Sequence, residues 1–138
     1  VRTSPTTFID AAHNPHGAAA LGAALDRDFE FNRLIGVVGV LDDKDARGIL
    51  VALEPYLSEV VITQNSSPRA LDAYDLAEHA REIFGEERVH VDENLAGAYA
   101  LAVELAEDAD IQSGAGVVVT GSVVTAGEAR TLFGKDPA

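Results

Sequence analysis

The stretch Phe8-Ile9-Asp10-Ala11-Ala12-His13-Asn14-Pro15-His16-Gly17 predicts a β-strand that turns directly into an α-helix. Residues 6–9 are all β-branched or aromatic, which is typical of a short strand. Asn14 can accept hydrogen bonds from the free N–H groups of a helix, and Pro15 suits the first helical position because it has no N–H to leave unpaired. We therefore expect a helix from Pro15 to about Arg27.

Asp10 and His13 lie in the turn of this junction. Open α/β sheets bind ligands between the carboxyl end of a strand and the amino end of the next helix, where exposed N–H groups favour anions. A phosphate or carboxylate ligand is the first hypothesis. Side chains that only hold the turn together by hydrogen bonds explain the local pattern equally well, so both interpretations stay open at this point.

Length and composition indicate one globular domain. The chain has 138 residues, of which 47% are hydrophobic, and it has no cysteine, which excludes disulfides and cysteine nucleophiles and is compatible with a cytoplasmic location. The longest apolar run, residues 34–41, is far shorter than the ~20 residues of a membrane helix. Methionine is absent even at position 1, so we expect residues 1–138 to be a domain excised from a longer polypeptide.

The charge of the chain disfavours nucleic acid as a partner. The formal net charge is −13, with 23 acidic residues against 10 Lys and Arg, which repels a phosphate backbone at long range. An anionic ligand would need local donors against this background. Cations that follow predicted strands, such as Lys44 and Arg69, are therefore candidates for binding such a ligand.

Predicted strands and helices alternate along the whole chain. The apolar run at 34–41 does not alternate, as expected of a central strand that is buried on both faces. Strands are expected at residues 6–9, 34–41, 60–63, 88–91 and 116–120. Helices are expected at residues 15–27, 46–53, 73–84, 95–106 and 125–133, the last with Thr125 and Glu128 as a capping box, and a loop at 112–115.

This alternation predicts a three-layer, Rossmann-like α/β domain. Its sheet is expected to be mostly parallel and doubly wound, with about five or six strands and with helices on both faces. Because right-handed crossovers place the carboxyl ends of parallel strands at the same edge, five residues from separate turns are expected along one edge. They are Asp10, His13, Lys44, Arg69 and Ser122.

Two familiar phosphate-binding signatures are absent from the chain. No Gly-x-Gly-x-x-Gly follows the first strand, and no Gly-x-x-x-x-Gly-Lys-Ser/Thr loop occurs. The domain therefore lacks the usual means to hold a dinucleotide or a triphosphate alone. His13-x-x-His16 offers only two potential ligands, so we expect no metal site.

Four short motifs follow the predicted strands in order: Asp10-Ala11-Ala12-His13-Asn14-Pro15, Val40-Leu41-Asp42-Asp43-Lys44-Asp45, Ser67-Pro68-Arg69-Ala70 and Thr120-Gly121-Ser122. Together they resemble the C-terminal domain of the folylpolyglutamate synthase/dihydrofolate synthase family, which is related to the Mur peptide ligases. The resemblance covers essentially the whole chain and implies a single Mur-ligase-type glutamate-ligase domain. Ala11 stands where that family commonly has glycine, so a positive φ there would be strained.

The resemblance implies part of an ATP-dependent ligase that adds L-glutamate to the γ-carboxyl of folate, with or without the joining of dihydropteroate to glutamate. In this family an N-terminal domain holds most of the ATP and Mg²⁺ and makes an acyl phosphate, over which the C-terminal domain closes. We therefore expect this chain to be the closing domain. Alone it should be inactive and bind neither ATP nor Mg²⁺.

Roles for the five edge residues follow from the same resemblance. Asp10 and His13 would contact the nucleotide, and His13 and Lys44 would act in catalysis. Lys44, Arg69 and Ser122 would hold the glutamate carboxylates or the acyl phosphate, with the division among them left open. Chemically, Arg69 suits bidentate binding of a carboxylate, and Lys44 suits a point contact with phosphate.

Purely structural roles remain as alternatives. Lys44 could pair with Asp43 or Asp45, and Arg69 could pair with Asp72; each exposed pair would contribute little. Ser122 could be an ordinary turn or cap residue.

A different function class is a non-enzymatic, flavodoxin-like module that binds an anion or a nucleotide for regulation. Asp42, Asp43 and Lys44 could imitate the acidic pocket of a receiver domain. A receiver, however, needs an aspartate after its third strand and a lysine after its fifth. Here those strands end in Thr63-Gln64 and Thr120-Gly121, which disfavours that interpretation.

Overall fold

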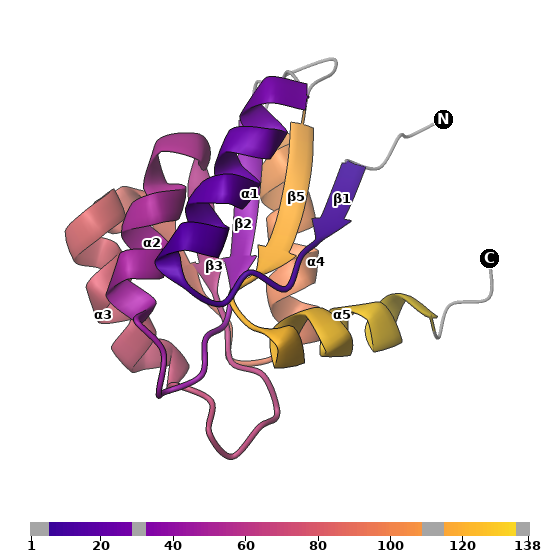
Figure 1. Cartoon of the computed structure of the whole chain (residues 1–138). Helices are drawn as coiled ribbons and strands as arrows, with labels where there is room; N and C mark the ends of the chain where they lie inside the picture. The colour runs from indigo at the N-terminus through magenta and orange to yellow at the C-terminus, as the bar shows by residue number, and fades with distance from the viewer. Residues whose placement is uncertain (1–5, 29–32, 109–114, 135–138) are drawn as a thin grey trace.

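The predicted α/β architecture is confirmed by the computed structural model, which describes residues 6–28, 33–108 and 115–134. A sheet of five strands, all parallel, has the order β1-β5-β2-β3-β4, and helices cover both of its faces (Figure 1). The strands are β1 (Thr6–Ile9), β2 (Arg33–Val38), β3 (Glu59–Ile62), β4 (Val89–Val91) and β5 (Ala115–Thr120). The predicted loop at 112–115 lies outside the described residues except for Ala115, which begins β5.

Five helices alternate with the strands, each close to its predicted position. They are α1 (Pro15–Asp28), α2 (Ala46–Leu53), α3 (Ala73–Phe84), α4 (Leu95–Asp108) and α5 (Val123–Gly134), with short 3₁₀ turns η1 (Glu54–Tyr56) and η2 (Glu86–Arg88). The central strand was predicted too long, because it ends at Val38 and not at Leu41. Beyond Val38 the chain leaves the parallel ladder, and Leu41 forms an antiparallel bridge with Ala70.

The order of the strands explains which helices share a face. The chain moves outward from β2 to β3 and β4 and then returns through α4 to place β5 between β1 and β2. Because the crossovers are right-handed, the return connection lies on the opposite face from the outward ones. One buried cluster accordingly joins the sheet to α1, α2 and α3, and a second joins it to α4 and α5.

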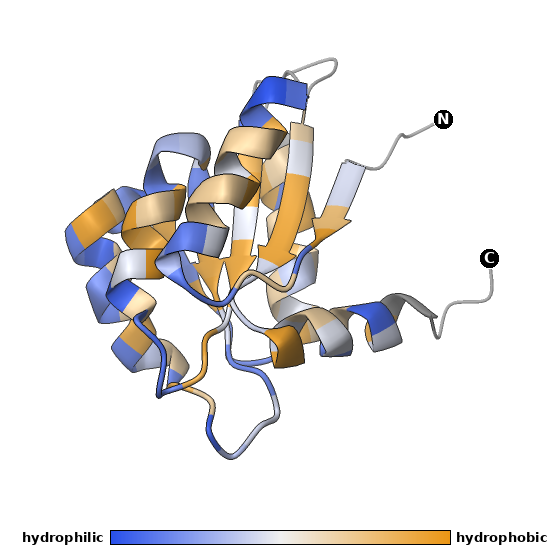
Figure 2. Ribbon diagram, in the orientation of Figure 1, coloured by the Kyte–Doolittle hydropathy of each residue, from blue (hydrophilic) through white to orange (hydrophobic). Residues whose placement is uncertain are grey.

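The central strands are apolar on both sides because both faces of the sheet are covered. Ile35, Val37 and Val38 of β2 are completely buried, and so are the valines 117–119 of β5. Figure 2 shows β2 and β5 mostly in orange, between helices whose ribbons mix blue, pale and orange residues. The apolar run that predicted a central strand is therefore explained by burial of β2 on both faces of the sheet.

Short polar side chains cap the amino ends of several helices. The side chain of Asn14 accepts a hydrogen bond from the Gly17 N–H at 2.7 Å, and Asn94 does the same for the Gly97 N–H at 3.0 Å, as their positions predicted. The predicted cap of the last helix is wrong. Ser122, three residues before Thr125, accepts the Thr125 N–H at 2.8 Å and caps α5. The Thr125 hydroxyl instead donates to the carbonyl oxygen of Gly39 at 2.8 Å.

Two glycines meet where β2 and β5 end. Gly121 has a φ of +116°, and a Cβ at this position would lie 2.5 Å from the carbonyl oxygen of Gly39. The Gly121 N–H also donates to the carbonyl oxygen of Ala12 at 3.2 Å. The turns after β1, β2 and β5 therefore converge on a point that excludes any side chain. Among the described residues no non-glycine residue has a positive φ, so the strain considered for Ala11 does not arise.

Substitution of Gly121 should be strongly destabilising. In Gly121→Ala the new methyl group combines an unfavourable φ with a backbone clash, and we expect a loss of about 3 kcal/mol in the free energy of unfolding. Gly127→Ala is the matched control, because Gly127 lies in α5 with nothing within 4 Å of an added Cβ. Alanine there should be neutral or stabilising by up to ~1 kcal/mol. Equal urea midpoints for the two variants would contradict this account.

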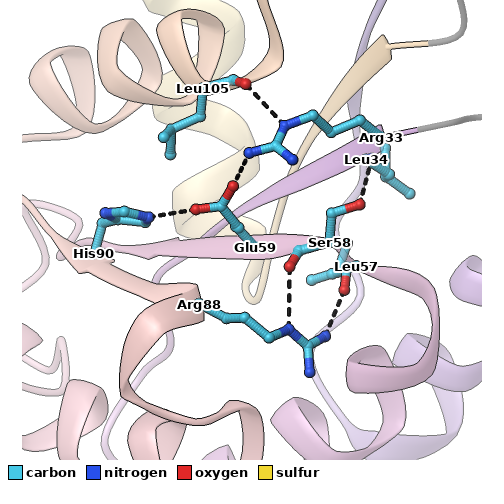
Figure 3. Close-up of polar contacts among 8 residues, drawn as sticks. All are labelled: Arg33, Leu34, Leu57, Ser58, Glu59, Arg88, His90 and Leu105. Carbon is cyan, nitrogen blue, oxygen red and sulfur yellow. Dashed lines mark hydrogen bonds and ion pairs between the residues drawn. The ribbon is translucent and has the colours of Figure 1, made fainter. Parts of the chain in front are cut away.

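A polar network connects the strands towards their amino ends, away from the turns that carry the predicted site (Figure 3). Glu59 accepts hydrogen bonds from the guanidinium of Arg33 and from Nε2 of His90, the latter at 2.6 Å. Arg33 also donates through Nε to the Leu105 carbonyl oxygen at 2.9 Å. The guanidinium of Arg88 donates to the carbonyl oxygens of residues 57 and 58. The network thus links three strands with α4 and the turn before β3.

Burial, together with the nearby charge of Arg33, lowers the pKa of His90. A neutral imidazole with its proton on Nε2 satisfies this environment, because that N–H donates to the Glu59 carboxylate.

The lowered pKa of His90 predicts a pH-dependent stability. Because the unfolded chain binds this proton more readily, the contribution is fully present above about pH 6.5 and is lost as the pH falls below that value. His90→Gln keeps an N–H donor but does not titrate. Between pH 8 and pH 5, urea unfolding should show a larger loss of stability for the wild type than for His90→Gln. The exposed His79, changed to Gln, controls for the residue type. Parallel pH profiles for wild type and His90→Gln would exclude the effect.

Candidate functional site

The five predicted site residues all lie in segments that follow strands at the carboxyl edge of the sheet. Backbone hydrogen bonds join these segments: Asp10 N–H donates to Val119, and Gly39 N–H donates to Thr120, at 3.0 and 3.3 Å. The spatial convergence expected from parallel strands is therefore present in the backbone.

The turn after β1 is held by its own side chains. Asp10 Oδ1 accepts the Ala12 N–H at 2.8 Å, and His13 Nδ1 lies 3.1 Å from the Ala11 carbonyl oxygen. Hydrogen bonds of this kind were expected if Asp10 and His13 only hold the turn together. They involve one carboxylate oxygen and one ring nitrogen, and the His13 side chain is exposed to solvent at the start of α1. These two contacts hold the turn in place.

The segments that carry Lys44 and Arg69 contact each other directly. The Asp42 N–H donates to the Arg69 carbonyl oxygen at 2.7 Å, and the Arg69 guanidinium pairs with Asp43. The pairing of Arg69 with Asp72 that served as the structural alternative does not occur, because Asp72 caps α3. The side chains of Arg69 and Asp43 are 59% and 46% exposed, so this ion pair contributes little to stability.

Lys44 is exposed between two carboxylates that are engaged elsewhere. Asp43 pairs with Arg69, and Asp45 caps α2 by accepting the Gly48 N–H at 2.9 Å. The alternative in which one of these residues pairs with Lys44 therefore receives no support.

The first turns of α1 and α2 lie against each other. A Cβ on Gly48 in α2 would be only 2.7 Å from Cγ of Pro15 in α1. His13 precedes one of these helices and Lys44 precedes the other. Two neighbouring helix amino termini, each with a basic side chain close to it in sequence, favour a negatively charged ligand. Within the described ranges, no hydrogen bond or ion pair joins His13 to Lys44 or Arg69.

Ser122 is placed differently from the other four residues. It is completely buried, its hydroxyl donates to Thr125 Oγ1 at 3.0 Å, and it accepts from the Thr125 N–H and from Asn65 Nδ2. The hydroxyl is therefore fully used by the protein in this conformation. Its assignment to substrate stays a prediction.

A cleft of about 950 Å³ opens beside this edge, on the side of α4 and α5. Its walls come from the loop after β3, the amino end of α4 and one side of α5, and they include Gln64, Asn65, Ser66, Glu93, Asn94 and Glu128. None of the five predicted residues lines it. The sequence showed residues 64–69 only as a turn-rich segment, since nothing local signals that Asn65 is buried against a helix 60 residues further along.

The described part of the chain brings no three His, Asp or Glu side chains together in a way that could hold a metal ion. In the same residues, no helix is both long enough and apolar enough to cross a membrane.

Known proteins with similar sequences are ligases that are longer than this chain. A dihydrofolate synthase/folylpolyglutamate synthase of Mycobacterium tuberculosis is 54% identical over 145 residues, which covers 99% of this chain and 30% of that protein. The enzyme of the same name from Haemophilus influenzae is 31% identical over 93% of this chain and 29% of its own length. The chain thus spans about 30% of the length of these relatives.

Solved structures agree with the sequence relatives. A crystal structure of Mycobacterium tuberculosis folylpolyglutamate synthase complexed with ADP and AMPPCP matches with a TM-score of 0.92 and 56% identity, over 99% of this chain and 31% of that one. The bifunctional Yersinia pestis enzyme complexed with AMPPNP and Mn ion matches with a TM-score of 0.77 and 27% identity, over 97% and 30% of the two chains.

The alternative of a non-enzymatic regulatory module receives no support from these matches. The sequence model of the family described as "Mur ligase, glutamate ligase domain" matches residues 1–123. With its parallel sheet and its strand-to-helix turns at one edge, the chain belongs to the Mur ligase, glutamate ligase domain family.

Proposed function

We propose that this chain is the C-terminal domain of a longer, cytoplasmic, ATP-dependent ligase that adds L-glutamate to folate, and that it closes onto an N-terminal ATPase domain of the same polypeptide. The observation that carries the proposal is the contact between the first turns of α1 and α2, with His13 and Lys44 immediately before them. The relatives named folylpolyglutamate synthase, which are about three times as long, support it. Whether dihydropteroate is a second substrate depends on parts of the polypeptide beyond this domain.

The turn after β1 is our candidate for contact with the nucleotide. The relatives solved with ADP, AMPPCP or AMPPNP support ATP as the co-substrate, which would supply the phosphoryl group that activates the folate carboxylate. Asp10 can accept hydrogen bonds from ribose hydroxyls, and His13 can donate to a phosphate oxygen at the positive end of α1. Mg²⁺ would be held mainly by the N-terminal domain, as the resemblance to this ligase family implies.

Lys44 and Arg69 are our candidates for binding the incoming glutamate and the negative charge that develops as its amine attacks. Arg69 already holds a carboxylate, that of Asp43, in an exposed and weak ion pair. A carboxylate of glutamate can replace Asp43 at small cost and gain bidentate hydrogen bonds. Lys44, which follows Asp43 in the chain, provides an exposed positive charge. Ser122 would reach substrate only if its buried hydroxyl exchanged one of its present partners.

Closure over the reacting groups explains why these residues belong to a separate domain. Cations and helix amino termini stabilise developing negative charge most strongly where water is excluded. In the isolated domain the same groups are exposed to solvent, so their full effect requires the partner domain.

The 138-residue chain alone should show no ATP-dependent ligation of glutamate to folate. The full-length polypeptide should show it in the same assay, followed as ADP release and as the mass of the folate product. Glutamate addition by the isolated chain would disprove its assignment as a closing domain.

In the full-length ligase, His13→Ala and Lys44→Ala should each lower kcat/KM about a hundredfold, because each removes a donor that faces negative charge in the transition state. His16→Ala is the matched control, since His16 is also exposed and lies in the first turn of α1. It should retain wild-type turnover. Wild-type rates for His13→Ala and Lys44→Ala would show that neither side chain takes part in catalysis.

A further inference from the structure

Asn65 is a buried amide that joins two parts of the carboxyl edge. Only 4% of it is exposed, and its Nδ2 donates to Thr125 Oγ1 at 2.9 Å and to Ser122 Oγ at 3.3 Å. On its other side, Oδ1 accepts the backbone N–H of Ser67 at 3.0 Å. Because a backbone N–H can only donate, this contact fixes which end of the amide faces the two hydroxyls.

The hydrogen bonds continue from Ser67 to the residues proposed to bind glutamate. Ser67 Oγ accepts the Arg69 N–H at 3.0 Å, and the Arg69 carbonyl oxygen accepts the Asp42 N–H at 2.7 Å. The Arg69 guanidinium then pairs with Asp43, the neighbour of Lys44. An unbroken series of polar contacts therefore runs from the start of α5 to Arg69 and its partner Asp43.

The hydroxyls beneath Asn65 have no spare hydrogen. Thr125 Oγ1 donates to the Gly39 carbonyl oxygen at 2.8 Å, and Ser122 Oγ donates to Thr125 Oγ1. Towards residue 65 both oxygens can therefore act only as acceptors, which suits the N–H groups of an amide and not a carboxylate. Every atom of this small network is buried and satisfied, so the loop has little freedom to shift.

A second contact attaches the same loop to α5. Glu128 accepts the backbone N–H of Ser66 at 2.8 Å and also the Ser66 hydroxyl. Gln64, which directly precedes Asn65, instead accepts the Ala73 N–H at 3.0 Å and so holds α3. Hydrogen bonds of the described residues thus connect this loop to α5 through Asn65 and Ser66 and to α3 through Gln64.

We infer that Asn65 is a positioning residue for glutamate recognition: acting through Ser67, it fixes the Arg69 guanidinium relative to β5 and α5. This inference rests on the proposed function, because it requires Arg69 to bind glutamate. Asn65 itself does not touch the substrate. Its loss should loosen the Arg69 loop and weaken glutamate binding while the nucleotide contacts of Asp10 and His13 remain in place.

The test is a double-mutant cycle in the full-length ligase, with the KM for glutamate and the KM for ATP measured separately. Asn65→Ala should raise the KM for glutamate about tenfold and leave the KM for ATP unchanged. Added to Arg69→Ala, it should have no further effect, because both changes remove the same contact. Gln64→Ala is the matched control from the same loop, and it should leave the KM for glutamate at the wild-type value.

Three outcomes would overturn the inference. Additive effects of Asn65→Ala and Arg69→Ala would show that Asn65 acts independently of Arg69. A normal glutamate KM in Asn65→Ala beside a defective Arg69→Ala would overturn the positioning role alone. A normal Arg69→Ala would overturn both that role and the place of Arg69 in the proposed function.

A second variant covers the case in which Asn65→Ala does not fold. Glu128 is partly exposed, so Glu128→Ala removes the other attachment of the loop without opening the core. We expect a rise of about threefold in the KM for glutamate, absent in the Arg69→Ala background. A wild-type glutamate KM in Glu128→Ala would then overturn the inference.

Discussion

The contact between Gly121 and the Gly39 carbonyl group is the constraint on which the carboxyl edge depends. With a Cβ at 2.5 Å from that oxygen, no other residue fits at position 121 without moving the backbone. The contact brings the turns after β2 and β5 together, and the hydrogen bond from Gly121 to Ala12 adds the turn after β1. Three segments that are distant in sequence are thereby held side by side before any ligand is present.

The two ends of the sheet have different physical characters. Towards the amino ends, Arg33, Glu59, His90 and Arg88 are partly buried and bonded to one another or to backbone carbonyl groups (Figure 3). At the carboxyl edge, charged side chains are exposed and weakly paired, over a buried network of hydroxyl and amide groups. The polar groups near the amino ends are engaged with one another, whereas exposed and weakly paired cations remain available to a ligand. The fold thus separates the polar groups that hold it together from those that can act.

A strongly acidic protein can still present an anion-binding edge because the relevant electrostatics are local. The net charge is −13, yet the first turns of α1 and α2 meet at one point and several neighbouring acids are occupied. Asp45 and Asp72 cap helices, and Asp43 pairs with Arg69. The background charge would in turn disfavour non-specific binding of polyanions.

Local chemistry in the sequence was sufficient to predict the alternating elements, the caps at Asn14 and Asn94, and the turns that carry the five candidate residues, because short-range periodicity and capping depend on neighbouring residues. The parallel arrangement then followed from the handedness of the crossovers. Only the tertiary structure decided the strand order, the early end of β2 and the burial of Ser122 and Asn65 against each other. Each of these depends on partners dozens of residues away, whose positions no local pattern specifies.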